Sequence, residues 1–264
     1  MWTFVRWEWA KHTRIPRFWG SFLAIALLGG LFVYGYTQLR SEPALAAVVG
    51  RGVPDGFFVP VLALSVSATV LLPLFVALIG ADMVSGERQM GTWPMLLTQG
   101  IRPWQLYISK WTVSAAFAGL ATLVLVTASA AGGAWFFGWH SAILPSGVRL
   151  SGGRLAMLMG AMTIYCAAGQ MVVASWAVAV SAFCRHTVSG VLIVVGVIAV
   201  MVTLGDLPFS TPLQPYLFTT YFSRALDVLS FPVNWTSMGR GLEVFGMYML
   251  ASWALIWCCQ PFRE

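Results

Sequence analysis

The chain has 264 residues, of which 59% are hydrophobic and 9% are charged, and its formal net charge is +6. Soluble domains carry about 25% charged residues, so this composition excludes a soluble protein and indicates a membrane protein. The 13 arginines and two lysines are dispersed along the chain instead of forming a basic run, which argues against nucleic acid as a partner.

The first predicted element is an interfacial helix over residues 1–17. Trp2, Val5 and Trp9 recur at helical spacing beside basic residues. Their rings would lie among the acyl chains while the cations contact lipid phosphates. Pro16 is expected to end this helix, because the residue before a proline disfavours helical backbone. An ordinary basic flank with tryptophans at the membrane surface is the alternative.

Six apolar runs without Asp, Glu, Lys or Arg are long enough to cross about 30 Å of hydrocarbon. They are residues 18–37, 57–81, 111–138, 155–182, 187–205 and 244–262. The first run is too long for a secretory signal peptide, so we expect it to remain as the first span. The predicted fold class is an all-α polytopic membrane protein with a single transmembrane domain over residues 1–264. Because no run holds a charged residue, ion coupling is not expected.

The distribution of Lys and Arg predicts how the spans are oriented. An even number of spans places both termini on one side, and that side carries nine of the 15 basic residues. Basic residues are enriched in cytoplasmic segments, so we expect a multi-pass protein of the plasma (inner) membrane with both termini in the cytoplasm. Residues 82–110 then form a cytosolic loop, and residues 206–243 lie outside.

The sequence indicates neither catalysis nor metal binding. Four cysteines lie within or at the ends of apolar runs and three histidines fall in separate loops, so no metal site is predicted. The chain lacks a G-x-x-x-x-G-K-[ST] loop for cradling ATP phosphates. An intramembrane protease would need a nucleophile and a base at one depth, yet no span has a central histidine. We therefore assign no catalytic residues.

The loop over residues 82–110 contains signals for a short helix at residues 93–99. Thr92 is a suitable N-cap, Pro94 is tolerated in a first turn, and Gly100 can take the left-handed position after the helix. A second helix is expected to begin near residue 103 and to continue into the third span.

The short helix would expose Trp93, Leu96 and Leu97 together. Exposed apolar patches usually mark a partner or a membrane. From the residues alone, a lipid surface and a groove in a cytosolic protein both stay open.

The same loop resembles a family pattern. In ABC transporter permeases of the type-2 (ABC-2) class, the second span is followed by G-E-R-E-x-G-T-x-x-x-L-L-x-x-P-x-S-R-x-x-x-x-x-x-K. The residues that resemble it are Gly86, Glu87, Arg88, Gly91, Thr92, Leu96, Leu97, Arg102 and Lys110. The family's Pro-x-Ser-Arg turn is replaced by Gly100-Ile101-Arg102-Pro103. In addition, Glu8, Lys11 and Arg14 resemble the start of permeases from the antimicrobial-peptide export and self-protection branch.

The resemblance implies that residues 93–99 form the coupling helix that contacts a nucleotide-binding subunit. The contact residues implied are Glu87, Arg88, Gly91, Thr92, Trp93, Leu96, Leu97 and Arg102. For Glu87 and Arg88, a solvated charge pair at a helix end is the alternative.

The resemblance also implies a function and partners. The chain would be the permease subunit of an exporter, with ATP and Mg bound by a separate ABC ATPase present in two copies and no cofactor in this chain. Six spans make half a permease, so an identical copy or a paralogue would complete it within the membrane lipids. The alternative is a permease that transmits mechanical work or a signal to an outer partner without transporting a substrate.

Candidate pathway residues lie in the second span. Ser65 and Thr69 are four residues apart and would share a helix face, and Pro60 and Pro73 can bend the helix. In the family, the second and fifth spans line the route. A largely apolar route with a few hydroxyls suits a hydrophobic or amphipathic peptide, lipid or drug. The alternative is that each hydroxyl bonds to its own helix.

Residues 206–243 are predicted to contain the outer gate. The stretch is proline-rich at its borders and strongly aromatic between them, which is unusual for a solvated loop. A re-entrant helical hairpin is expected, and a helix lying on the bilayer surface is the alternative. The gate candidates are Tyr216, Phe218, Phe222 and Phe231.

Overall fold

The computed structural model describes residues 2–39, 56–92, 103–139, 142–143, 149–207, 212–229 and 234–259. Its α-helices are α1 (Trp2–Thr13), α2 (Pro16–Leu39), α4 (Phe58–Ser67), α5 (Leu71–Gln89), α7 (Pro103–Phe137), α8 (Gly152–Ser181), α9 (Thr187–Asp206) and α10 (Trp235–Cys259). Two 3₁₀ helices, η2 (Gln214–Tyr216) and η3 (Phe218–Leu229), lie between α9 and α10. A two-residue antiparallel pair, β1 (Ala142–Ile143) with β2 (Arg149–Leu150), lies between α7 and α8.

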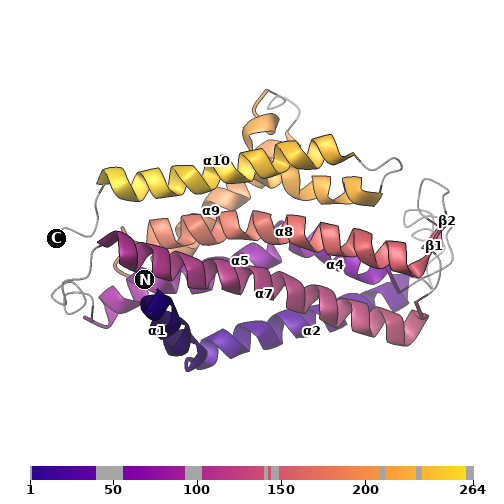
Figure 1. Ribbon diagram of the computed structural model, residues 1–264, viewed down its shortest axis with the longest axis horizontal. Helices are drawn as coiled ribbons and strands as arrows, with labels where there is room; N and C mark the ends of the chain where they lie inside the picture. Colours follow the sequence, from indigo (N-terminus) through magenta and orange to yellow (C-terminus); the bar gives the residue numbers. More distant parts are fainter. Residues whose placement is uncertain are drawn as a thin grey trace.

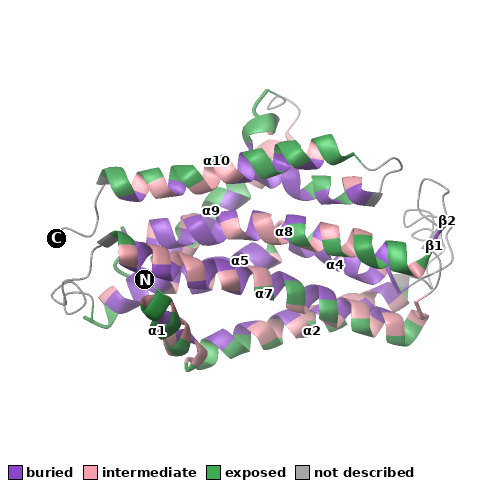
Figure 2. Ribbon diagram, viewed as in Figure 1, coloured by how far each residue is buried: buried purple, intermediate pink, exposed green. Residues whose placement is uncertain are grey.

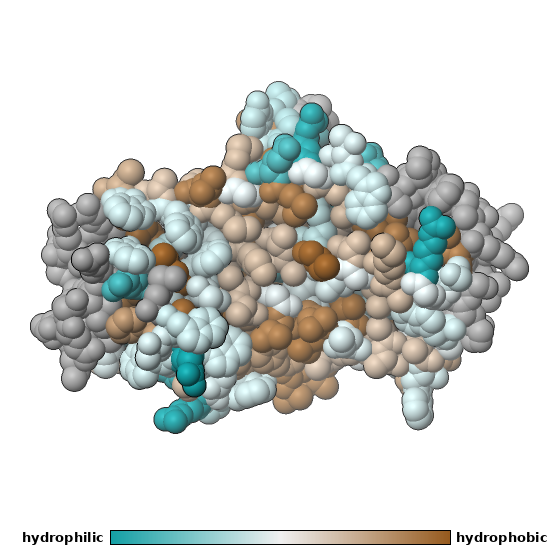
Figure 3. Space-filling model, in the orientation of Figure 1, coloured by the Kyte–Doolittle hydropathy of each residue, from teal (hydrophilic) through white to brown (hydrophobic). Residues whose placement is uncertain are grey.

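The long helices lie side by side along the longest axis of the molecule (Figure 1). Within the part of the chain that the structure describes, five are long and apolar enough to cross a membrane, and the bent pair of α4 and α5 makes six if it counts as one span. The surface in Figure 3 is apolar across its middle, with hydrophilic side chains toward both ends and on a protruding segment. The prediction of an all-α polytopic membrane protein is confirmed.

The core lies around α7 and α8, which pack against each other and against most of the other helices. More than half of the α7 span is buried, at 56%, against 17% of the α9 span. Figure 2 shows the same gradient, with buried residues concentrated along the central helices. Small residues permit the close contacts: a Cβ at Gly80 of α5 would lie 2.6 Å from the Cβ of Ala177 in α8. The peripheral α9 is thus left with a largely exposed apolar surface.

The second span differs from the continuous run predicted over residues 57–81. It is divided into α4 and α5, which meet at an angle of 55°, and α5 continues to Gln89. Pro60 and Pro73 each lie in the first turn of their own helix, where proline is tolerated. In a helix that continued from α4 into α5, Pro73 would lie in the interior, where its ring would clash with the carbonyl of residue 69. Val70, at the break, has a non-helical backbone. We attribute the bend to Pro73.

The third span begins as predicted, and the sixth does not. The helix expected near residue 103 does begin at Pro103 and continues into the third span as α7, as predicted. The sixth span begins at Trp235 instead of residue 244. The prediction failed there because it stopped at charged residues, whereas α10 includes Arg240 and Glu243 near its beginning.

The amino-terminal helix ends close to where the sequence predicts. Helix α1 ends at Thr13, and α2 begins at Pro16, a position where proline needs no amide hydrogen. Between them, the amide of Ile15 donates to the carbonyl of His12 at 3.0 Å. The start of the chain and the end of α10 lie at the same end of the bundle (Figure 1), as an even number of crossings requires. Which end faces the cytoplasm stays a prediction.

Candidate functional site

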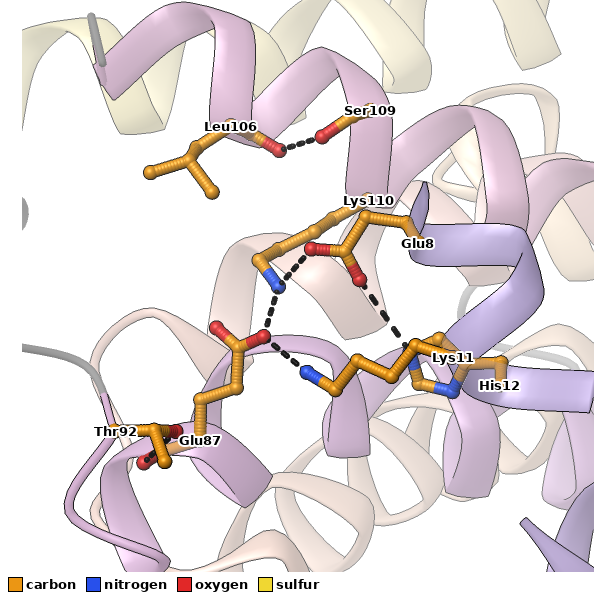
Figure 4. A network of polar contacts seen from close by, with 8 residues as sticks. All are labelled: Glu8, Lys11, His12, Glu87, Thr92, Leu106, Ser109 and Lys110. Atoms are coloured by element: carbon orange, nitrogen blue, oxygen red, sulfur yellow. Dashed lines mark hydrogen bonds and ion pairs between the residues drawn. The ribbon is translucent and has the colours of Figure 1, made fainter. Parts of the chain in front are cut away.

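Three helices converge beside the segment that joins α5 to α7. Helix α5 ends at Gln89 and α7 begins at Pro103, so both border residues 93–102. Helix α1 packs against α7 at the same place. Figure 4 shows side chains from all three helices pointing toward one another there.

Lys110 of α7 is the centre of this arrangement. Its side chain is 0% exposed, and its Nζ donates to Oε1 of Glu8 at 2.9 Å and to Oε1 of Glu87 at 2.7 Å. Both carboxylates are 1% exposed. Taking a charge out of water costs several kcal/mol unless it is paired and hydrogen-bonded. The three side chains can therefore be buried only together, which joins α1, α5 and α7.

A second lysine completes the charge balance. Lys11 of α1 forms an ion pair with Oε1 of Glu87 and lies 5.7 Å from the centroid of the Trp7 ring. Two ammonium groups therefore face two carboxylates, as the dashed lines in Figure 4 show. The prediction that the basic residues of α1 contact lipid phosphates is wrong for Lys11. We call Glu8, Lys11, Glu87 and Lys110 the buried ion-pair network.

His12 lies at the edge of this network. Its Nε2 is 3.7 Å from Oε2 of Glu8, and its side chain is 5% exposed. Burial lowers the pKa of His12 below its ordinary value of 6.5. Lys110 and Lys11 act in the same direction, while Glu8 and Asp82 oppose it. Burial thus favours the neutral form of His12 beside the network.

The end of α5 is closed by Gly91 and Thr92. Gly91 has a positive φ of 71°, the left-handed conformation that glycine adopts readily after a helix. The amide and the hydroxyl of Thr92 both donate to the carbonyl of Glu87, at 3.1 Å and 3.2 Å. The residue that anchors the network in α5 therefore also fixes the direction in which the chain leaves that helix.

The predicted ATPase-contact residues fall into different environments. Glu87 is buried, so the alternative of a solvated charge pair is wrong for it. Arg88 is half-buried, and Gly91 and Thr92 are exposed. The other four, which are Trp93, Leu96, Leu97 and Arg102, lie outside the described residues. Contact with an ATPase stays a prediction for all of them.

A second polar contact ties the same part of α5 to other helices. Oδ1 of Asp82 is 3.6 Å from Nη1 of Arg17 in α2 and accepts a hydrogen bond of 3.0 Å from the hydroxyl of Thr187 in α9. The hydroxyl of Ser85 donates to Thr187 Oγ1 at 3.5 Å. Sequence reasoning gave Asp82 and Glu8 no structural role. For Asp82 the available signal was its position directly after the second apolar run, where an ionised side chain that turns inward needs a partner, and Glu8 gave no such signal.

The predicted pathway pair does not share a helix face. The hydroxyl of Ser65 donates to the carbonyl of Val61 at 2.7 Å, as the alternative expected. Helix α4 ends at Ser67, so Thr69 lies in the break between α4 and α5. The argument from four-residue spacing is therefore wrong, because it requires a continuous helix. A role for either hydroxyl in substrate passage stays a prediction.

The break itself is held by a residue that sequence reasoning missed. Gln170 of α8 is 0% exposed, and its Nε2 donates to the carbonyl of Ala68 at 2.8 Å. A carbonyl at a helix break has lost its partner in the next turn and needs another donor in an apolar core. A single amide within the fourth apolar run was the available signal for this contact.

The predicted gate residues also fall into different environments. Phe218 and Phe222 are buried, and a Cβ at Gly169 of α8 would lie 2.4 Å from the ring of Phe222. The hydroxyl of Tyr165 in α8 donates to the carbonyl of residue 221 at 3.0 Å. Tyr216 is 68% exposed, and Phe231 lies outside the described residues. Helix η3 is thus packed into the bundle, while its function as a gate and its re-entry into the bilayer stay predictions.

The family comparison covers this site. The sequence model of a family described as ABC-2 family transporter protein matches residues 2–211, about four-fifths of the chain. The matched range contains the whole buried ion-pair network. It does not extend to η2, η3 or α10. A search of curated proteins found no significant match.

Proposed function

The chain belongs to the ABC-2 transporter family, and from this premise we propose that it is the membrane-spanning permease subunit of an ABC exporter. ATP would be hydrolysed by a separate subunit that binds ATP and Mg. The observation that supports this proposal is the buried ion-pair network, because it joins α1 to α5 and α7, the two helices that precede and follow residues 93–102 in the chain. A partner that moves this segment would move those helices with it.

The network suits the transmission of force. Separating one partner from a buried pair costs about 3–5 kcal/mol, so a modest displacement of residues 93–102 would carry the joined helix ends along. Helix α7 has 35 residues and therefore extends over roughly 52 Å. A movement at its network end would be passed along its whole length as a rigid element.

The expected assembly contains two ATPase subunits and a second permease half, either identical or a paralogue. The exposure of α9 supports the proposal of a second permease half, because only 17% of the α9 span is buried within this chain. Exposed apolar surface of this extent is covered by lipid or by another protein. We place the assembly in the plasma membrane with both termini in the cytoplasm.

The proposed substrate is a hydrophobic or amphipathic molecule such as a peptide, a lipid or a drug. The central turns of the spans contain no Asp, Glu, Lys or Arg. Pathways for ions and protons usually retain such residues, because an isolated charge in the membrane is otherwise unfavourable. An apolar route lined by a few hydroxyls fits an amphipathic molecule better than an ion.

The test uses the chain purified together with its ATPase and reconstituted in sealed vesicles. We expect ATP-dependent movement of an amphipathic substrate, and we expect Trp93→Asp and Leu97→Asp to remove most of the substrate-stimulated ATP turnover. Gln89→Asp is the matched control, because Gln89 is an exposed residue close to the same segment. Normal turnover in both variants would show that residues 93–99 do not form the coupling contact.

The same vesicle experiment distinguishes export from the alternative function, the transmission of mechanical work or a signal. ATP turnover without movement of any compound would favour a permease that transmits mechanical work to an outer partner. Retained assembly and retained turnover in Leu97→Lys would instead indicate that residues 93–99 only lie on lipid headgroups.

A further inference from the structure

A polar cavity of about 400 Å³ lies between η2, η3 and the first turns of α10. Arg224 of η3 and Arg240 of α10 both line it, together with amide and hydroxyl side chains. The cavity is separate from the buried ion-pair network, which involves α1, α5 and α7. A concave surface with several convergent polar groups is the usual form of a ligand site.

The charge of the cavity is positive. Nη1 of Arg224 is 3.8 Å from Oδ2 of Asp227, which partly offsets its charge. Arg240 has no ion-pair partner among the residues that the structure describes. Glu243 follows one turn later on α10 but does not line the cavity. One guanidinium is thus left uncompensated at the cavity wall, and an anion would provide its partner.

Neutral donors surround the two guanidinium groups. Asn234 accepts a hydrogen bond of 3.2 Å from the amide of Ser237 through its Oδ1, so its side-chain NH₂ is available to donate. The hydroxyl of Thr220 is buried and has no hydrogen-bond partner among the described residues. The amino-terminal end of α10 adds a partial positive charge. These hydrogen-bond donors outnumber those that the two oxygens of a carboxylate would use, so the cavity suits an anion with more oxygens.

We propose that this cavity binds a phosphate group. The guanidinium fork of arginine matches phosphate oxygens and forms two parallel hydrogen bonds to them. The surrounding hydroxyl and amide groups would donate to the remaining oxygens. The phosphate would come from a lipid headgroup or from a soluble phosphate ester. The inference does not depend on the proposed export function, because it concerns binding alone.

The place of the cavity in the fold is compatible with a lipid headgroup. Trp235, the first residue of α10, is 58% exposed. Tryptophans concentrate where acyl chains meet headgroups, so the first turn of α10 is expected at that level. In Figure 1 this turn lies at the end of the bundle away from α1. Arginines near the end of a span can extend their charged groups toward the headgroups.

Binding is measured on the full-length chain purified in mild detergent. The probes are inorganic phosphate, glycerol 1-phosphate and a short-chain phosphatidylglycerol, with acetate for comparison. We expect Arg240→Gln and Arg224→Gln each to raise the Kd for the phosphate probes about tenfold or more, the effect of losing one charge-assisted contact. Arg154→Gln is the control, because Arg154 is an exposed arginine at the beginning of α8, and it should leave the Kd unchanged.

The relative affinities of the probes distinguish a lipid headgroup from a soluble phosphate ester, and the variants show whether the proposed site is the one that binds. Phosphatidylglycerol that binds at least tenfold more tightly than glycerol 1-phosphate identifies a lipid headgroup, and equal affinities identify a soluble ester. Equal Kd values for wild type and both arginine variants would overturn the proposal. So would an equal loss in Arg154→Gln, or acetate that binds as tightly as phosphate.

Folding is controlled separately. The Tm of each variant without ligand shows whether it is folded. If Arg240→Gln does not fold, the same titration with Arg240→Lys and Asn234→Asp decides the question, because Asn234→Asp keeps the oxygen that accepts from the Ser237 amide and removes the NH₂ donor. Arg240→Lys keeps the charge but loses the fork, so weakened binding supports the site and unchanged binding in both variants contradicts it.

Discussion

At the scale of single residues, Lys110 shows how burial changes the role of a charged side chain. A lysine at the border of an apolar run is normally expected to reach the membrane surface with its ammonium group. Here the side chain turns inward, where two carboxylates from different helices hold it. Lys110, which the sequence showed only as the last residue of a family motif, thus joins three helices.

The pairing of Lys110 with Glu8 is testable by a double-mutant cycle. Lys110→Met keeps most of the volume but leaves a buried carboxylate uncompensated, so we expect a loss of about 3–5 kcal/mol in unfolding free energy. Adding Glu8→Gln should recover part of that loss, because the second change removes the uncompensated charge. The measurement is unfolding in detergent. Strict additivity of the two single losses would argue against the buried pair.

His12 predicts a pH dependence with a definite sign. Its pKa in the folded protein is lowered from 6.5, chiefly by burial. The unfolded state therefore binds more protons as the pH falls below about 6.5, and the folded protein loses stability on acidification through that range. The contribution is fully present above pH 6.5.

The measurement is the Tm of the wild type and of His12→Asn between pH 7.5 and 5. The groups around His12 are Glu8 and Lys11 on α1, Lys110 on α7 and Asp82 on α5. Because these remain in the variant, the difference between the two curves isolates His12. We expect a smaller loss in His12→Asn, and superimposable curves would contradict the assignment.

At the scale of elements, the break in the second span depends on two residues, one within that span and one in another. Pro73 prevents a continuous helix, and Gln170 satisfies the carbonyl that the break exposes. Neither residue alone explains the geometry, because a break in an apolar core without a donor would leave a polar group unpaired. The bend between α4 and α5 is therefore a property of two spans and not of one sequence segment.

Replacing Gln170 tests this account. Gln170→Leu removes the donor to the Ala68 carbonyl, and an unsatisfied buried acceptor costs about 1–3 kcal/mol. We expect a loss of that size in unfolding free energy, measured in detergent. Gln89→Leu is the control, because Gln89 is exposed at the end of α5, and it should change stability by less than about 0.5 kcal/mol. Oε1 of Gln170 is buried without a hydrogen-bond partner among the described residues, so Gln170→Glu, which keeps the size but removes the NH₂ donor, is measured beside Gln170→Leu. No loss of stability in either variant would contradict this account.

At the scale of the whole molecule, both ends of the described chain lie at one end of the bundle (Figure 1). The buried ion-pair network lies at that end, while the phosphate-binding cavity proposed above lies toward the other. If residues 93–99 contact an ATPase, the network end is cytoplasmic. An experiment that determines the orientation of the molecule in the membrane therefore also tests the proposed position of the ATPase.

Accessibility of single cysteines to a membrane-impermeant maleimide checks that orientation. In a variant whose four cysteines are replaced, Thr13→Cys should react only in inside-out vesicles and Arg154→Cys only in right-side-out vesicles or intact cells. Thr13 lies just before the first candidate span, and Arg154 is an exposed residue in the first turn of the candidate span Gly152–Ser181. The opposite pattern would place residues 93–102 outside and exclude contact with a cytoplasmic ATPase.

The sequence by itself determined the class of the protein, the approximate positions of the spans and the helix that begins at Pro103. These features depend on hydrophobicity, length and local backbone preference, which are properties of contiguous residues. The motif around Glu87 also pointed to the right part of the chain, and it led to a family that the comparison confirms.

Only the tertiary structure decided which side chains meet. Glu8 and Lys110 are 102 residues apart, and so are Ala68 and Gln170. No local pattern encodes such pairings, because they depend on how the helices pack and on which polar groups that packing removes from water. The same reason explains why Glu87, for which an ATPase contact and a solvated charge pair were the two predictions, is buried. It also explains why the bend that the prolines allow in the second span is a complete break at Val70.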